Sequence, residues 1–257
     1  MLLVRIAIFD SGLGSLSIIK SLQKKFKCEI IYFADQHNFP YGTKSKKELD
    51  IIIRKSISYL KKNYSPDIIV MASNTPSLLL DSVETRIIKV TPPIIEASKL
   101  SKTNNIGILA TESAINSKGL ENFVKKSGLR KKNKIHKINA SSLVNLVESG
   151  KFLTNKKLCR TIIQKELGNY FYEHKIDVVT LSSTHLPFLK SFFNKQFPDI
   201  TFLDPSDLIA ETIFKKRNFD FQKRNKMKII TTGNAKKFEK ILLKQGIKNK
   251  PYQIPYL

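Results

Sequence analysis

The chain has 257 residues, 41% of them hydrophobic, and a formal net charge of +24. This length can supply two modest α/β lobes, and no apolar run reaches the roughly 18 to 20 residues that a membrane-spanning helix needs. Seven of the 45 basic residues are Arg, which leaves 38 Lys. Because base reading and bidentate phosphate contacts favour Arg, we interpret the charge as a solvated surface and do not expect nucleic acid as a partner.

The N-terminal segment indicates where the protein is located, and the cysteines indicate which kinds of site to expect. Residues 1–10 form a short apolar stretch without the basic leader and cleavage site of a secretory signal, so we expect a cytoplasmic protein. Cys28 and Cys159 lie in unrelated segments with no metal-ligand spacing. We therefore expect no metal and no disulfide. Cys28 is interpreted as an inert, half-buried thiol, and Cys159 is interpreted in the same way.

Short β-branched runs alternate with longer segments of helical periodicity, which is typical of parallel sheets flanked by helices. The fold class is predicted to be α/β. Strands are predicted near Ile6–Phe9, Glu29–Phe33, Ile68–Ala72, Ile106–Ala110, Lys134–Ile138, Val178–Leu181 and Thr201–Leu203. Helices are predicted at Ser15–Phe26, Lys44–Asn63, Ser113–Lys126 and Asn155–His174.

Two segments of the sequence repeat. Residues 67–75 (DIIVMASNT) resemble residues 177–185 (DVVTLSSTH) at an offset of 110, and residues 5–11 resemble residues 105–111 at an offset of 100. The repeat indicates two similar lobes, each a mostly parallel sheet. In open parallel sheets, ligands bind beyond the carboxyl ends of the strands. We therefore expect an active-site cleft between the lobes, with Ser73 and Ser183 on opposite walls.

The lobe boundaries are predicted from breaks in the pattern. The first lobe is assigned residues 1–97 plus 206–257, and the second residues 98–205. Pro92 and Pro93 mark the expected hinge, because proline interrupts both helices and strands. Residues 223–228 are interpreted as a basic surface connector, and the last helix, near Ala235–Leu243, is expected to pack on the first lobe.

Four short motifs carry the candidate chemistry. The turn Asp10-Ser-Gly-Leu-Gly-Ser15 follows a strand and opens a helix, where free N–H groups attract anions. It lacks the third glycine of a dinucleotide fingerprint. Phe39-Pro-Tyr-Gly42 is a turn in which Tyr41 could donate to a carboxylate. Ser73-Asn-Thr75 and Ser183-Thr-His185 end equivalent strands. A ligand-free turn or simple helix capping would produce similar patterns.

In this order and spacing, the four motifs make the chain similar, over nearly its whole length, to the glutamate racemase branch of the aspartate/glutamate racemase family. That family carries D-S-G-x-G-G-L, P-Y-G, C-N-T and C-T-H motifs. Weaker matches are Glu96, Thr111 and Glu148.

The resemblance implies a cofactor-independent isomerase. Two bases would exchange the α-proton of L- and D-glutamate, and the D-glutamate would supply peptidoglycan synthesis in the cell wall. It places the catalytic groups at Ser73 and Ser183, with Asp10 and His185 tuning them. It also implies a substrate-binding set: Asp10, Ser11, Tyr41, Gly42, Asn74, Thr75, Thr184 and His185. The sequence leaves open a homodimer and a preference for aspartate.

The chain departs from the family pattern at the two residues expected to be cysteine, because Ser73 and Ser183 replace both thiols. A hydroxyl is a far weaker acid than a thiol, whose pKa is about 8.5. Three hypotheses stay open. Binding could survive with little or no catalysis, which would make the chain an acidic amino-acid binding or regulatory protein. Asp10 and His185 could act as the bases. The serines could also have been introduced deliberately, although other departures, such as Leu186, favour natural drift.

Overall fold

The structure is a computed structural model that describes residues 4–80, 87–215 and 224–257. It consists of two compact units, Met1–Val90 with Ser206–Leu257, and Thr91–Pro205. The first crossing thus follows Val90 and does not follow residue 97. The reason is that helix α4 (Ile94–Leu100) belongs to the second unit, where Ala97 packs with Ile106 and Val178.

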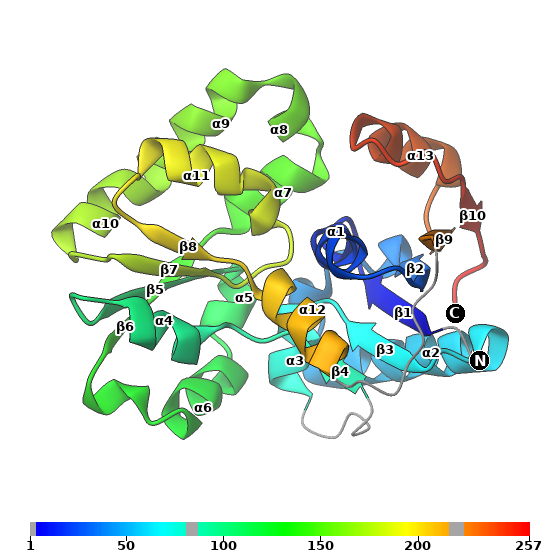
Figure 1. The fold of residues 1–257 in the computed structure, drawn as a ribbon, viewed down its shortest axis with the longest axis horizontal. Helices are drawn as coiled ribbons and strands as arrows, with labels where there is room; N and C mark the ends of the chain where they lie inside the picture. Colours follow the sequence, from blue (N-terminus) through cyan, green and yellow to red (C-terminus); the bar gives the residue numbers. More distant parts are fainter. Residues whose placement is uncertain (1–3, 81–86, 216–223) are drawn as a thin grey trace. The chain divides into compact units, whose positions relative to one another are not determined.

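The described part of the first unit contains a six-stranded parallel sheet in the order β10, β9, β2, β1, β3, β4 (Figure 1). The strands are β1 (Arg5–Asp10), β2 (Glu29–Ala34), β3 (Ile68–Met71), β4 (Ile87–Lys89), β9 (Lys226–Thr231) and β10 (Pro251–Gln253). The helices are α1 (Ser15–Lys25), α2 (Lys46–Tyr64), α3 (Asn74–Leu79), α12 (Pro205–Lys215) and α13 (Ala235–Lys244), with short 3₁₀ turns η1 (Gln36–Asn38) and η2 (Tyr41–Thr43). This unit holds three of the four motifs.

Successive side chains of a strand face opposite sides of its sheet, and the first unit buries both sides. Ala7 and Phe9 of β1 belong to one core cluster with Ile53 of α2. Ile6 and Ile8 are fully buried on the other side, and α1 contacts β1 and β2. The continuous apolar runs in the sequence follow from this double coverage.

The second unit contains a four-stranded parallel sheet in the order β6, β5, β7, β8. In Figure 1, α9 and α11 lie on one side of this sheet and α6 on the other. The strands are β5 (Asn105–Ala110), β6 (Lys134–Asn139), β7 (Val178–Leu181) and β8 (Thr201–Leu203). The helical elements besides α4 are α5 (Glu112–Ile115), α6 (Lys118–Lys126), η3 (Leu129–Lys131), α7 (Ser141–Glu148), α8 (Lys151–Thr154), α9 (Lys156–Ile163), the π-helical turn η4 (Gln164–Gly168), α10 (Asn169–Glu173), η5 (Leu186–Leu189) and α11 (Lys190–Gln196).

The two sheets repeat one strand arrangement, β2–β1–β3–β4 in the first unit and β6–β5–β7–β8 in the second. Ile6 of β1 pairs with Ile68 of β3, and Ile106 of β5 pairs with Val178 of β7. These partners are related by the offsets of 100 and 110 seen in the sequence. The prediction of two similar α/β lobes is therefore confirmed.

Several sequence-based assignments need correction. Lys226–Lys228, interpreted as part of a surface connector, form the start of β9, which pairs with β2 inside the sheet; Lys223 lies outside the described residues. The helix predicted at Ser113–Lys126 is interrupted, because α5 ends at Ile115 and Ser117 caps a new helix, α6, by accepting from Leu120 N at 3.0 Å. Strands β4 and β10 were not predicted. Each has only three residues.

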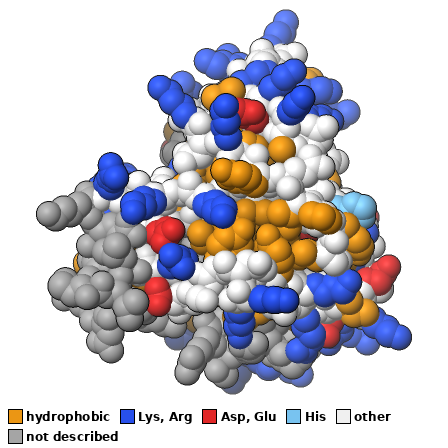
Figure 2. All heavy atoms as spheres, turned by 90° about the vertical axis from the view of Figure 1, so that its right-hand side faces the viewer, with side chains coloured by type: hydrophobic (Ala, Val, Ile, Leu, Met, Phe, Trp, Pro, Cys, Tyr) orange, Lys and Arg blue, Asp and Glu red, His pale blue; other side chains and the backbone are white. Residues whose placement is uncertain are grey.

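Figure 2 shows Lys and Arg side chains distributed around a central hydrophobic area on one face, with Asp and Glu among them. Within the described residues, no helix is long and apolar enough to span a bilayer.

A carboxylate at the amino end of β7 fixes the segment before β5. Asp177 accepts hydrogen bonds from Ser101 Oγ (2.6 Å), Lys102 N (2.6 Å), Thr103 N (3.0 Å) and Thr103 Oγ1 (2.9 Å). Burial favours the protonated carboxyl, but these hydrogen bonds outweigh it and hold the pKa of Asp177 below its usual value.

We expect Asp177→Asn to lower the free energy of unfolding by about 1–3 kcal/mol at neutral pH. Because the folded-state pKa is depressed, this stabilisation is present above the unfolded pKa of about 4 and is lost as the pH falls through the folded value. Urea unfolding of both proteins between pH 7 and pH 3 measures the difference. Asp50→Asn, which alters an exposed pair with Arg54, should have little effect. A difference that stayed constant down to pH 3 would contradict the assignment.

Candidate functional site

The glycine-containing turn begins at the carboxyl end of β1. Asp10, the last residue of β1, is 2% exposed, and its Oδ1 accepts from Ser11 N at 2.6 Å. Ser11 is also buried. The Tyr32 hydroxyl donates to Gly12 O at 2.8 Å and so ties the turn to β2. A carboxylate is thus held at the end of a central strand.

Tyr41 lies in η2, beyond the end of β2, and is fixed by a second buried acid. Its hydroxyl donates to Asp35 Oδ2 at 3.0 Å, and only 2% of the residue is exposed. Burial, followed by the negative charges of Asp35 and Asp10, raises the pKa of Tyr41 well above its ordinary value. The hydroxyl is therefore protonated and engaged with Asp35, whereas the sequence suggested that it binds a ligand carboxylate. Gly42, next to it, is partly exposed.

The third motif follows β3. Ser73 is half-buried and occupies the N-cap position of α3 without making a side-chain capping bond, so capping does not account for it. Asn74 is 4% exposed, and neither its amide nitrogen nor its amide oxygen has a hydrogen-bond partner among the described residues. Thr75 is buried beside it. A buried amide that lacks partners costs free energy unless a ligand or water satisfies it.

These residues converge because β2, β1 and β3 are adjacent and parallel, so their carboxyl ends share one edge of the sheet. The η2 turn contacts α3. Asp10, Tyr41 and Asn74 therefore belong to one cluster, together with Ser11, Gly42, Ser73 and Thr75. The first unit alone supplies a carboxylate, a hydroxyl and an unpaired amide.

The second unit carries the fourth motif at the end of β7. Ser183, Thr184 and His185 are at most 8% exposed. His185 Nε2 is paired with the Oε1 atom of Glu148, the last residue of α7, and His185 N donates to Ser183 Oγ at 3.5 Å. A carboxylate on Nε2 fixes the orientation of the imidazole. The weaker sequence match at Glu148 thus supplies the partner of His185.

The other two residues that weakly match the family pattern, Thr111 and Glu96, both lie in the second unit. Thr111 occupies the position equivalent to Ser11, and its Oγ1 lies 3.3 Å from Ser113 Oγ. Glu96 lies in the first turn of α4 and is partly exposed. The structure gives neither residue a contact with the Ser183 motif.

Both cysteine thiols are buried. Cys28 is fully buried, where the sequence indicated half-burial, and burial raises the pKa of its thiol to about 12. Burial likewise raises the pKa of Cys159. Within the ranges that the structure describes, no group of three His, Cys, Asp or Glu side chains could hold a metal ion.

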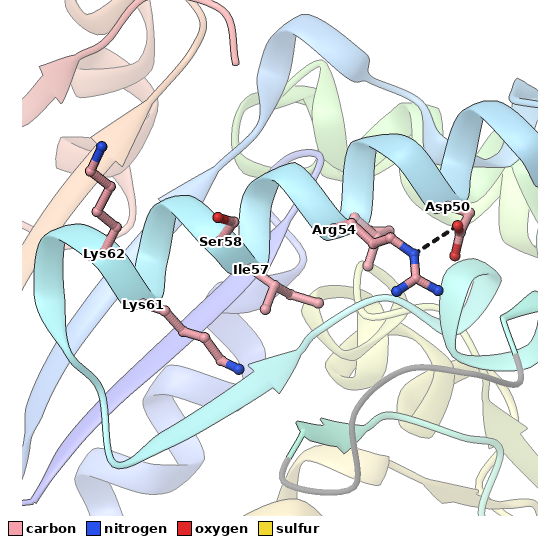
Figure 3. Close-up of a pocket in the computed structure, with 7 residues that line it drawn as sticks. Asp50, Arg54, Ile57, Ser58, Lys61 and Lys62 are labelled. Carbon is pink, nitrogen blue, oxygen red and sulfur yellow. Dashed lines mark hydrogen bonds and ion pairs between the residues drawn. The ribbon is translucent and has the colours of Figure 1, made fainter.

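Surface hollows occur away from these motifs, and two of them have a defined lining. One, of about 370 Å³, is lined by α2 residues between Asp50 and Lys62, with Arg54 paired to Asp50 at its rim (Figure 3). The other, of about 700 Å³, lies at the amino ends of β7 and β8 and is lined by Phe171 and Phe197, among others. None of the candidate residues lines either hollow, so neither is assigned to the site.

Known structures share this fold. Glutamate racemase RacE1 from Bacillus anthracis matches with a TM-score of 0.82 and 23% identity, over 98% of this chain and 97% of that one. Escherichia coli glutamate racemase, in complex with L-glutamate and the activator UDP-MurNAc-Ala, matches with a TM-score of 0.83 and 20% identity over the whole of both chains. The fold is therefore that of the two-lobed α/β racemases.

Sequence relatives are more specific. The chain is 33% identical to the glutamate racemase of Sulfurihydrogenibium sp. (strain YO3AOP1) over 246 residues, which cover 92% of this chain and 91% of the relative. It is 31% identical to that of Persephonella marina over 245 residues, with the same coverage. No model of a protein family matches the sequence. The chain belongs to the glutamate racemase family.

The unpaired amide gives a test of the site without any ligand. We expect Asn74→Leu to raise the free energy of unfolding by about 1 kcal/mol, because it removes two unsatisfied buried polar atoms at similar volume. Urea denaturation measures this change. The matched control is Asn38→Leu, which should destabilise because Asn38 Nδ2 donates to Asp35 at 2.8 Å. A comparable loss of stability in Asn74→Leu would mean that the amide is satisfied in the free protein.

Proposed function

We propose that the chain binds glutamate at the two strand-end motifs and interconverts its enantiomers by proton transfer, without a cofactor, supplying D-glutamate for peptidoglycan. The observation that carries the proposal is the buried amide of Asn74, next to Ser73 in the chain, whose nitrogen and oxygen have no hydrogen-bond partner in the part of the chain that the structure describes. An amino acid offers an ammonium donor and carboxylate acceptors to such a group. Family membership supports the choice of glutamate.

A hydroxyl is not deprotonated at neutral pH as a thiol of lowered pKa can be, so each serine needs a separate base. The proposed bases are Asp10 for Ser73 and His185 for Ser183. Each hydroxyl relays a proton: as the base takes the hydroxyl proton, the serine oxygen accepts the α-proton of the substrate. To complete the exchange, the Ser183 hydroxyl gives its proton to the α-carbon and is reprotonated by His185. The His185–Glu148 pair supports this role, because the carboxylate fixes the orientation of the imidazole.

A second candidate is a glutamate-binding protein without racemase activity. The observation that favours it is the presence of hydroxyls at both thiol positions. Serine keeps the size and the hydrogen bonding of cysteine but loses the matched pKa of an efficient base. The substitution therefore affects catalysis far more than binding.

Exchange of the α-proton of L- and D-glutamate in deuterated water, followed by NMR, separates the two candidates. We expect slow exchange with inversion for the wild-type chain, lowered by Asp10→Asn and by His185→Asn. Ser73→Cys with Ser183→Cys should raise the rate by about 100-fold or more, since a positioned base of suitable pKa contributes about 10²–10⁴-fold.

The controls are Asp67→Asn, at the amino end of β3, and Ser58→Cys, on the exposed face of α2. Neither should change the exchange rate. If neither the wild type nor the double cysteine variant exceeded the buffer rate, the racemase proposal would fail. Saturable glutamate binding in that case would establish the second candidate.

A further inference from the structure

A buried carboxylate outside the recognised motifs joins three segments of the first unit. Asp35 directly follows β2 and is 1% exposed. It accepts hydrogen bonds from Asn38 Nδ2 (2.8 Å), the Tyr41 hydroxyl (3.0 Å) and Thr232 Oγ1 (2.9 Å). Three donors hydrogen-bond to the charged carboxylate, so it is held in a fixed position at this edge of the sheet.

The fold itself does not require this acid. Asp35 N donates to Asp10 O at 2.8 Å, and at the equivalent place in the second unit Ala140 N donates to Ala110 O at the same distance. The duplicated sheet thus makes the same backbone bond with alanine in place of both acids. We therefore attribute the Asp35 carboxylate to a structural feature that the first unit has and the second lacks.

The first unit differs in having the η2 turn. Tyr41 begins this turn, its ring is buried in the core, and the turn contacts α3, which begins at Asn74. The Tyr41 hydroxyl donates to Asp35 Oδ2 at 3.0 Å, and the Ser56 side chain is a second hydrogen-bonding group beside it. Gly42 follows Tyr41 in the chain and is partly exposed. Its backbone is restrained because Tyr41, the preceding residue, is hydrogen-bonded to Asp35.

Thr232 connects this arrangement to the C-terminal part of the chain. Its Oγ1 accepts from His37 N at 3.0 Å and donates to Asp35 Oδ1 at 2.9 Å. Thr232 directly follows β9, and its own N donates to Ala34 O at 3.2 Å. The end of β9 therefore belongs structurally to the cluster, although it is 197 residues from Asp35 in the sequence.

We infer that Asp35 is a positioning residue for glutamate binding: anchored by Thr232, it fixes Tyr41 and so presents the backbone of the Tyr41–Gly42 segment as a preformed donor. This inference rests on the proposed function. A preformed donor lowers the ordering cost of binding. Loss of Asp35 should loosen η2 first and weaken glutamate binding as a consequence.

Two measurements on the full chain test this. Hydrogen–deuterium exchange of a peptide spanning residues 36–44 should be at least about 10-fold faster in Asp35→Asn than in the wild type. The dissociation constant of L-glutamate, from calorimetry, should rise about 10-fold in Asp35→Asn and in Tyr41→Phe. The double variant should be no weaker than either single variant, because both remove the same hydrogen bond.

The matched control is Asp67→Asn, the same chemical change at the amino end of the sheet, where Asp67 accepts from Arg5 N at 2.7 Å. It should alter neither measurement for residues 36–44. Unchanged exchange in Asp35→Asn, or additive losses of affinity in the double variant, would overturn the inference. If the wild type bound no glutamate, the proposed function would fail, and the exchange measurement would still decide whether Asp35 positions the turn.

Discussion

The site depends on the register of parallel strand pairing. Asp10 pairs with Ala34, so that Asp35 emerges one residue beyond the end of β2, and Phe9 pairs with Met71, so that Ser73 emerges beyond β3. A one-residue slip would turn every side chain of a strand to the opposite face of the sheet. Because both faces are buried, the apolar packing fixes the register, and the register in turn aligns the polar strand ends.

The two units share this scaffold but distribute charge differently. The first unit carries two acids, Asp10 and Asp35, where the second has Ala110 and Ala140. The second instead places Glu148 on a helix, where it pairs with His185. The duplicated core tolerates this divergence because the strand ends lie beyond the packed layers. Acid–base groups there can change without disturbing the apolar interior.

The strands predicted from the sequence include all four of the second sheet and three of the first, whereas β4, β9 and β10 of the first sheet were not predicted. The apolar runs of β1, β3, β5 and β7 are recognisable because they are buried on both sides. β9 was missed because it begins Lys226-Met-Lys228, with exposed lysines, and β10 because it has three residues and starts with Pro251. Asp35 was not predicted either, although an acid at the carboxyl end of a strand, as at Asp10, indicates a polar strand end.

The residues alone establish the α/β class, the repeat, the family motifs and the presence of hydroxyls at both thiol positions, because these follow from local pattern and identity. Only the tertiary structure assigns partners: Tyr41 to Asp35, Asp35 to Thr232 and His185 to Glu148. Such pairs span up to 197 residues of sequence. They exist because strand order and helix packing bring distant segments to one sheet edge, and neither composition nor spacing encodes that order directly.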